Sequence, residues 1–255
     1  MRRIVTLMIV LALGATLSAC GSSSPPSSST STSSSPPSST STSSPPSVSP
    51  RAQLAAMRSA ARSKHSVHTV SISTAPGHTI SIVCDAGTNE GSQRIIVTDH
   101  GKTGSLMVIV TAGTAYVRGD ALTLHLYYGF SSGQSTRYAG KWISVPDSNA
   151  AYATVSAGVT FASFLSQLFQ PMTTPSIVTA GRLIGVHGTV HGQAGPSAMT
   201  TLFAPAHGEP LPVKQTAKSS GKGGTGVVTM SKWNEPVQVS APANAVPITT
   251  VLSKF

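Results

Sequence analysis

The sequence predicts an α+β domain in which one large antiparallel sheet carries a few helices on one face. From residue 70 onward, apolar and polar residues alternate in short runs, which is the pattern of strands with one buried face. Glycine-containing turns separate these runs, as in an antiparallel meander. Only a few segments have helical spacing, and strands and helices do not alternate regularly as they do in a parallel sheet.

The chain begins with a segment that predicts export. Arg2 and Arg3 precede an apolar run over residues 4–13 that only Thr6 interrupts, and small residues follow it. A positive start, a short apolar core and a small-residue end are typical of a secretory signal peptide. The apolar run is too short for a comfortable membrane span, which needs roughly 20 residues. We therefore expect residues 1–19 to be a signal peptide.

The end of this leader, Leu17-Ser18-Ala19-Cys20-Gly21, resembles the bacterial lipobox. The resemblance implies that the Cys20 thiol receives a diacylglyceryl group and that cleavage makes Cys20 the first residue of the mature chain. One acyl chain anchors only marginally, at about 0.8 kcal/mol per buried methylene, whereas two or three chains hold firmly. We expect a lipid anchor at the extracytoplasmic face of the cell membrane. The alternative is an ordinary secretory leader with a cysteine there by chance.

Residues 20–50 predict a disordered tether behind this anchor. After Cys20 they are almost entirely Ser, Thr and Pro, and Val48 is their one large aliphatic residue. Such a segment cannot bury enough apolar surface to offset the entropy lost on ordering. Proline pairs bias it toward extended geometry, so 30 residues at about 3.1 Å each could reach roughly 90 Å. The composition also permits O-glycosylation.

The remaining residues, 51–255, predict one domain with a scattered positive charge. Only 9% of the chain is charged, and the formal net charge is +10. Nucleic-acid binding needs a concentrated basic stripe, and the sequence has none, so we expect no nucleic-acid partner. The charge fits weak attraction to anionic lipid headgroups or cell-wall polymers, or simply a solvated basic surface.

Cys84 is expected to be a buried, unreactive thiol. If Cys20 is acylated, Cys84 has no partner, because the chain has two cysteines. It follows Ile80 and Ile82 at strand spacing, so the three side chains share one face of a predicted strand. The fold should therefore not depend on a disulfide, although an exported protein could form one.

The first half of the domain should contain one helix and five strands. Residues 51–64 place Leu54, Met57 and Ala61 at helical spacing. The period then falls to two, with turn residues between the runs. The continuously apolar run at 106–110 predicts a strand covered on both faces. The five predicted strands centre on residues 70–72, 80–82, 95–97, 106–110 and 116–119.

The second half should mix helices with further strands. Asp120 is the predicted N-cap of a helix over residues 121–128. Thr160 should cap the clearest helix, over residues 160–169, which ends before Pro171. The end of a strand is expected at 141–146, and further strands at 183–190, 198–203, 211–215, 226–230 and 237–240.

No arrangement of residues predicts catalysis. Residues 129–133 match the Gly-x-Ser-x-Gly nucleophile elbow with Ser131 as the nucleophile. That motif needs a parallel-sheet strand before it and a helix after it, whereas this pentapeptide lies in a Gly/Ser-rich connection. Seven acidic residues are present, and none pair in an obvious setting for general acid–base work. We therefore expect a protein that is not an enzyme.

The histidines do not predict a metal site either. His187 and His191 are four residues apart in a strand pattern, which would separate them by about 13 Å. His65 and His68 straddle a predicted helix–strand boundary and lack a third ligand nearby. Residues 221–224 lack the full phosphate-loop pattern and suggest a hairpin loop. We expect no metal and no cofactor.

The order of these segments resembles the actinobacterial lipoproteins of the LppX–LprG group, which is related in fold to the LolA/LolB lipoprotein carriers. The local matches are Ala-Tyr-Val-Arg-Gly at 115–119, Tyr-Ala-Gly-Lys-Trp-Ile at 138–143, and residues 233–242. The resemblance covers most of 51–255. It implies a large curved antiparallel sheet, a half-barrel, with helices packed on its concave face around an apolar cavity. In that family the cavity binds acyl chains of lipids or lipoglycans, and the protein carries them across the envelope.

Apolar residues on the predicted strands and helix supply candidates for the lining of such a cavity. They are Leu106, Val108, Val110, Phe161, Phe164, Leu165 and Leu168. A packed core is the competing interpretation of the same residues. A cavity of several hundred cubic ångströms would favour a lipid-binding envelope carrier. A closed core would favour a structural or sensory lipoprotein that acts through an envelope protein partner. A hydrolase is a third and more distant hypothesis.

Overall fold

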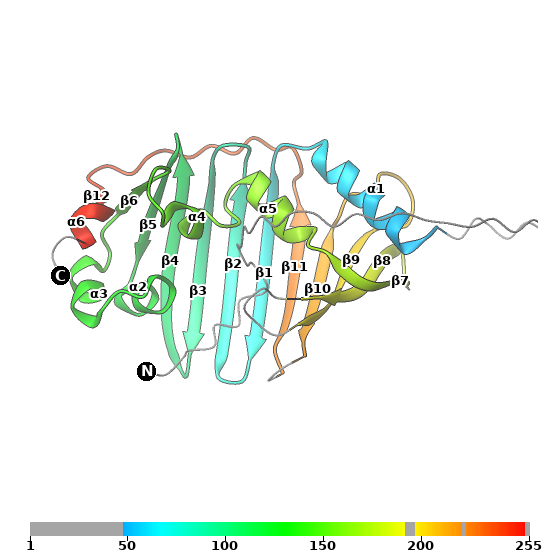
Figure 1. Cartoon of the computed structure of the whole chain (residues 1–255), viewed down its shortest axis with the longest axis horizontal. Coiled ribbons are helices and arrows are strands. Elements are labelled where there is room, and N and C mark those ends of the chain that lie inside the picture. The colour runs from blue at the N-terminus through cyan, green and yellow to red at the C-terminus, as the bar shows by residue number, and fades with distance from the viewer. Residues whose placement is uncertain (1–47, 192–196, 221–222, 253–255) are drawn as a thin grey trace, which may run out of the picture.

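The computed structural model describes residues 48–191, 197–220 and 223–252, which form one curved, open sheet of 12 strands with six helices (Figure 1). The strand order is β12-β6-β5-β4-β3-β2-β1-β11-β10-β9-β8-β7. Neighbouring strands are antiparallel, except that β12 and β6 pair in parallel. The predicted α+β class with a large curved antiparallel sheet is thereby confirmed.

A first meander builds the half of the sheet that contains β1 to β6. Its strands are β1 (Val67–Ala75), β2 (His78–Ala86), β3 (Gly91–Asp99), β4 (Lys102–Thr111), β5 (Thr114–Gly119) and β6 (Ile143–Pro146). Two of its hairpins close through two-residue turns, His100-Gly101 and Ala112-Gly113, in which both residues have positive φ. Such turns twist in the same sense as the strands they join, which fixes the register.

A second meander starts at the opposite edge and returns to β1. It consists of β7 (Met172–Ala180), β8 (Leu183–Val190), β9 (Ala198–Pro205), β10 (Lys214–Ser219) and β11 (Thr225–Ser231). Strand β11 then pairs with β1, so the two meanders join at the middle of the sheet. The chain next crosses one end of the sheet to β12 (Val246–Pro247) and α6 (Ile248–Leu252) at the far edge (Figure 1).

Helices pack on the concave face because the strands alternate a buried face with a more exposed one. Helix α1 (Pro50–Arg62) lies over β7 and β8, and α2 (Ala121–Tyr128) lies over β4 and β5. Helix α5 (Phe161–Leu168) crosses in front of β2, β1 and β11, with the short α4 (Tyr152–Val155) beside it (Figure 1). The seven-residue α3 (Ser132–Tyr138) follows α2 near the β6 edge (Figure 1).

The buried apolar residues fall into two clusters. One cluster joins β3 to β6 with α2 and α6 and includes Leu106, Leu124, Ile143 and Val251. The other joins α1 and α5 to the sheet beneath them, and its members include Met57, Phe161, Phe164, Leu168, Val186 and Leu202. Each half of the sheet therefore has its own core. The space between α5 and the middle strands lies beside the second cluster.

Several elements differ from the sequence-based expectations. Residues 237–240 form no strand, because the chain there crosses the end of the sheet as irregular backbone. Strand β7 was not predicted, because Pro175 in its sequence argues against a strand. The structure tolerates this proline at a register shift between Thr173 and Ser176 on an edge strand. The run 106–110 is also not covered equally on both faces, because its odd-numbered residues are only half-buried.

Candidate functional site

A pocket of about 140 Å³ lies between α5 and the concave face of the central strands. The connection from α5 to β7 closes one side, and Ser219 and Gly224, beside the β10–β11 turn, lie at another. Its apolar lining residues include Ile82, Cys84, Phe164, Leu168, Met172, Val190, Ala198 and Val228. Its polar lining residues include Thr69, Ser71, Gln93, Gln167, Thr200 and Gln215.

The sheet wall of the pocket has room because small side chains face α5. Strand β1 contributes the buried Thr69 and Ser71 to the inner face, where a larger residue would fill the space. Strands β10 and β11 contribute Ala217 and Gly226, which are register partners across the ladder. Three adjacent strands thus present short side chains at the place that α5 covers.

The helix wall is held at both of its ends. At the start, the Thr160 hydroxyl accepts a hydrogen bond from the Ser163 backbone N–H at 3.4 Å, as expected for an N-cap. At the end, Arg58 of α1 donates to the Phe169 carbonyl at 3.0 Å, and its guanidinium lies 5.4 Å from the Phe169 ring centre. These contacts fix the side of α5 that bears Phe164 and Leu168 against the pocket.

Gln167 is a polar residue in the mostly apolar lining of the pocket, and its side-chain Nε2 has no hydrogen-bond partner among the described residues. Its Nε2 atom is buried and makes no hydrogen bond to any of the residues that the structure describes. A buried donor without a partner costs about 1–3 kcal/mol. Gln167 also lines the pocket, so this side chain lies beside the place that a bound molecule would occupy.

Cys84 lines the same pocket as an unreactive thiol. Its side chain is buried, and its Sγ donates to the Gly158 carbonyl at 3.5 Å. Burial, with a smaller contribution from the Asp85 carboxylate, raises the pKa of the Cys84 thiol to about 12. The thiolate is the nucleophilic form of cysteine, so a thiol with this pKa contributes packing rather than chemistry. The predicted buried, free Cys84 is confirmed.

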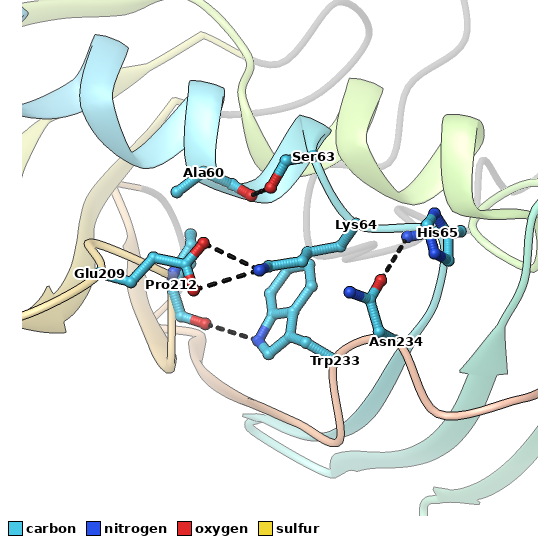
Figure 2. A network of polar contacts seen from close by, with 8 residues as sticks. All are labelled: Ala60, Ser63, Lys64, His65, Glu209, Pro212, Trp233 and Asn234. Carbon is cyan, nitrogen blue, oxygen red and sulfur yellow. Dashed lines mark hydrogen bonds and ion pairs between the residues drawn. The ribbon is translucent and has the colours of Figure 1, made fainter.

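A network of polar contacts ties the connection between α1 and β1 to the second meander and to the segment after β11 (Figure 2). Lys64 pairs with Glu209 at 2.9 Å. The Trp233 indole donates to the Pro212 carbonyl at 3.2 Å, and the His65 backbone N–H donates to the Asn234 side chain at 2.9 Å. Three segments far apart in the sequence therefore meet beside the helices that cover the pocket.

Of the seven residues predicted to line a cavity, some line the pocket and the others belong to the buried clusters. Phe164 and Leu168 line the pocket. Phe161 is buried in the same cluster without lining it, and Leu165 packs against that cluster. Leu106, Val108 and Val110 are 1–2% exposed and belong to the other cluster, packed with α2, β5 and β6. Sequence spacing selected apolar faces, and it could not tell which of the two clusters each face would enter.

Ser131 lies between two helices rather than after a strand. Its hydroxyl accepts from the Gln134 backbone N–H, and the Gln134 side chain accepts from the Ser131 N–H, which makes a capping box for α3. The strand–turn–helix geometry of a nucleophile elbow is therefore not present at this serine.

The histidines considered from the sequence have separate partners. His187 contacts the Thr201 hydroxyl at 2.9 Å, and His191 contacts the Ser197 hydroxyl at the same distance. His68 pairs with the Asp85 carboxylate at 2.7 Å.

Sequence reasoning missed a different group, formed by His78, Asp99 and His100. Its ligand atoms all lie within 4.8 Å of one another. The signal that could have found it is the register of the β2–β3 hairpin, which makes His78 and Asp99 direct partners.

A second hollow, of about 510 Å³, lies where the segment after β11 crosses the end of the sheet. It is lined mostly by polar side chains and loop backbone, among them Ser66, Thr88, Asn89 and Glu90. It is larger than the pocket under α5, but its polar lining does not suit an apolar ligand, so the smaller pocket is the candidate site.

Comparison with known proteins defines the class of fold. No family model matches the chain, and a search of curated proteins finds no match. Among solved structures, LprF from Mycobacterium bovis is similar at 17% identity and a TM-score of 0.50, over 76% of this chain and 97% of LprF. The lipoprotein LppX from Mycobacterium tuberculosis is similar at 20% identity and a TM-score of 0.43, over 74% of this chain and 99% of LppX.

The chain therefore has the fold of LprF, an open curved sheet with helices on its concave face. The likeness to LprF confirms, at the level of the fold alone, the resemblance that the sequence suggested. Within the described residues, no helix is both long and apolar enough to cross a membrane. The predicted signal peptide, the lipidation site Cys20 and most of the tether lie outside the described residues and stay predictions.

Proposed function

We propose that the protein is a membrane-anchored lipoprotein of the cell envelope that binds acyl chains of lipids or lipoglycans and carries them across the envelope. We propose a binding role rather than an enzymatic one. The observation that carries this proposal is the pocket under α5, whose lining is mostly apolar and includes Gln167, a residue with a buried Nε2 that has no partner among the described residues.

Apolar side chains on both walls supply the driving force for binding an acyl chain. Phe164 and Leu168 face the pocket from α5, while Ile82, Val190 and Val228 face it from the sheet. Each methylene that leaves water for such surroundings contributes about 0.8 kcal/mol. We therefore narrow the proposed lipid contacts of the seven candidates to Phe164 and Leu168.

The volume of the pocket limits how much of an acyl chain the pocket can hold. At about 140 Å³ it is close in size to an engineered apolar cavity of about 150 Å³ that takes up benzene. It is smaller than the roughly 300–1,000 Å³ of pockets that enclose drug-sized ligands. In our proposal the pocket holds one end of an acyl chain, and the rest of the chain leaves past Ser219 and Gly224 at the β10–β11 end.

The Gln167 amide gives the proposed ligand a chemical class. Its Nε2 donor would pair with a carbonyl or hydroxyl oxygen near the end of an apolar chain, which an acyl ester supplies and a plain hydrocarbon does not. Binding such an oxygen would remove the cost of the unpaired donor, so the site would favour acylated molecules.

The proposed location follows from the predicted anchor. Helix α1 begins at Pro50, so residues 20–49 would separate a lipidated Cys20 from the folded domain. At about 3.1 Å per residue this tether spans at most roughly 90 Å. The domain would then work at the extracytoplasmic face of the cell membrane, within reach of lipids in that membrane.

Mass spectrometry of organic extracts, together with uptake of a fluorescent fatty acid, tests lipid binding in the full chain with Cys20→Ser. Ala217→Phe should block uptake, because Ala217 lines the pocket. Thr216→Phe is the matched control, since neighbouring residues of a strand face opposite sides of the sheet. Equal uptake by both folded variants would remove the pocket from the proposal.

A second variant separates apolar binding from recognition of an ester. Gln167→Leu removes the amide and keeps a side chain of similar bulk. It should weaken binding of an acyl ester and leave binding of an alkane probe of equal length unchanged. If no lipid co-purifies and no probe is taken up by the Cys20→Ser chain, the alternative of a structural or sensory lipoprotein with a protein partner is favoured.

A further inference from the structure

A group of three potential metal ligands lies at the tips of two neighbouring hairpins, away from the pocket. His78 begins β2, Asp99 ends β3, and His100 is the first residue of the β3–β4 turn. The His78 Nδ1 lies 2.6 Å from Asp99 Oδ1, and the His100 Nδ1 lies 2.8 Å from the same oxygen. Two imidazoles thus converge on one carboxylate oxygen.

The backbone holds the three residues in this arrangement. His78 and Asp99 are register partners across the β2–β3 ladder. His100 has φ of 47°, as the two-residue turn demands, and its N–H donates to the Gly77 carbonyl at 2.8 Å. The His100 backbone is therefore bonded across to the β1–β2 turn, and its ring is carried to the side where His78 lies.

The two rings are arranged so that both can face a common point. Their centres lie 4.7 Å apart and their planes are nearly perpendicular, at 88°. The His78 side chain is 44% exposed and the His100 side chain 73% exposed, so an ion and its water can reach them. The Asp99 carboxylate is less exposed and forms the floor of the group.

We propose that His78, Asp99 and His100 form a binding site for a divalent transition-metal ion of the Zn²⁺ type. Imidazole nitrogen and carboxylate oxygen bind Zn²⁺ at about 2.0–2.2 Å, and two histidines with one carboxylate are a known ligand set that leaves a fourth position for water. In tetrahedral geometry such ligand atoms lie about 3.3 Å apart, so the His78 imidazole must withdraw from Asp99 by about 0.7 Å and the His100 imidazole by about 0.5 Å. Exposed side chains at turns can make that movement.

The other histidines provide an internal comparison. His68 has the same kind of contact as His78, a 2.7 Å approach of its Nδ1 to a carboxylate oxygen of Asp85. Among the described residues, however, the group of His78, Asp99 and His100 is the one in which three potential ligands converge. A third ligand is what separates a metal site from a surface ion pair, so the two places should behave differently toward an ion.

An ion held by these three residues would link neighbouring hairpins. Asp99 and His100 belong to the β3–β4 hairpin, whereas His78 follows the β1–β2 turn. A bound ion would therefore connect two hairpin tips that are otherwise joined by the sheet ladder, the His78–Asp99 side-chain contact and the His100–Gly77 hydrogen bond. Because an ion that binds only the folded state stabilises it, saturating Zn²⁺ should raise the midpoint of thermal unfolding.

The test is titration of protein that carries no histidine tag with Zn²⁺ by calorimetry, and with Co²⁺ by visible absorption. We expect one ion per chain, and cobalt bands of a site with nitrogen and oxygen ligands. Asp99→Asn and His100→Asn should each weaken binding by at least the roughly 10- to 100-fold that loss of an outer contact costs. Asparagine also accepts positive φ, so His100→Asn preserves the turn.

His68→Ala is the matched control. It removes a histidine that also contacts a carboxylate, that of Asp85, but that belongs to no group of three potential ligands among the described residues. It should leave the affinity and stoichiometry unchanged. The proposal is overturned if the wild-type chain shows no saturable binding up to about 1 mM Zn²⁺. It is equally overturned if the His68→Ala variant loses as much affinity as the His100→Asn variant.

Discussion

The indole of Trp233 packs edge-on against Phe164, with ring centres 6.2 Å apart. Trp233 follows β11, and Phe164 is one of the residues of α5 that line the pocket. A second ring contact, to Phe161, lies at the same distance, and the indole N–H is bonded to the Pro212 carbonyl. The segment after β11 thus holds the helix that covers the pocket.

Replacing Trp233 should therefore affect both stability and the pocket. Trp233→Ala should lower the free energy of unfolding by about 2–4 kcal/mol, because a half-buried aromatic side chain and its ring contacts are lost. Urea unfolding measures this change. Trp142→Ala is the control, since Trp142 is also half-buried and stacks on Arg118 on another part of the sheet. Uptake of the fluorescent fatty acid should fall in Trp233→Ala and persist in Trp142→Ala.

Gly91 permits the connection before α5 to lie directly on β3. A Cβ atom there would lie 2.1 Å from the Val159 carbonyl oxygen, which belongs to the backbone and cannot move aside cheaply. Gly91→Ala should cost more than the about 1–3 kcal/mol typical of overpacking, as measured by thermal or urea unfolding. Gly133→Ala in α3 meets nothing within 4 Å and should stabilise by about 0.5–1 kcal/mol. Equal effects of the two changes would contradict this packing.

Cys84 should make the protein less stable in alkali. Below pH 9 the thiol is protonated in both the folded and the unfolded chain, so its contribution to stability is fully present. Above pH 9 the unfolded thiol ionises while the buried one keeps its proton until about pH 12, because burial raises its pKa. The free energy of unfolding should fall by up to about 1.4 kcal/mol per pH unit on this account.

Cys84→Ala tests this dependence between pH 9 and 10. The variant lacks the titrating thiol, so its unfolding free energy should change less steeply with pH than that of the wild-type chain. Alkylation provides a second measurement, because the folded wild-type thiol should react with iodoacetamide far more slowly than the denatured one. Fast alkylation of the folded chain at pH 8 would contradict the burial of Cys84.

Ser131 should stabilise helix α3 as its N-cap and should have no catalytic role. Ser131→Ala removes the cap of α3 and should lower the free energy of unfolding by about 1 kcal/mol. Any weak hydrolysis of a nitrophenyl ester by the purified protein should continue unchanged in the variant. Loss of an esterase activity in Ser131→Ala, with the fold intact by circular dichroism, would restore the hydrolase hypothesis.

Local signals in the sequence were enough for many elements. Asp120 accepts from the Thr123 backbone N–H at the start of α2, and Thr160 caps α5, both as expected. The short Gly turns fixed the hairpins of the first meander. Strand β7 was not predicted, because Pro175 and the register shift around it are tolerated only by an edge strand, and being at an edge is a property of the whole sheet.

The sequence by itself determined which side chains form apolar faces, where most hairpins turn and that Cys84 is buried, because each of these follows from the spacing of neighbouring residues. Tertiary structure decided what those faces meet. Leu106 enters a closed core, whereas Phe164 faces a pocket, because α2 covers β4 and α5 stands over the small residues of β1, β10 and β11. It also brought His78 to Asp99 and His100, since a sheet ladder joins residues by register rather than by distance along the chain.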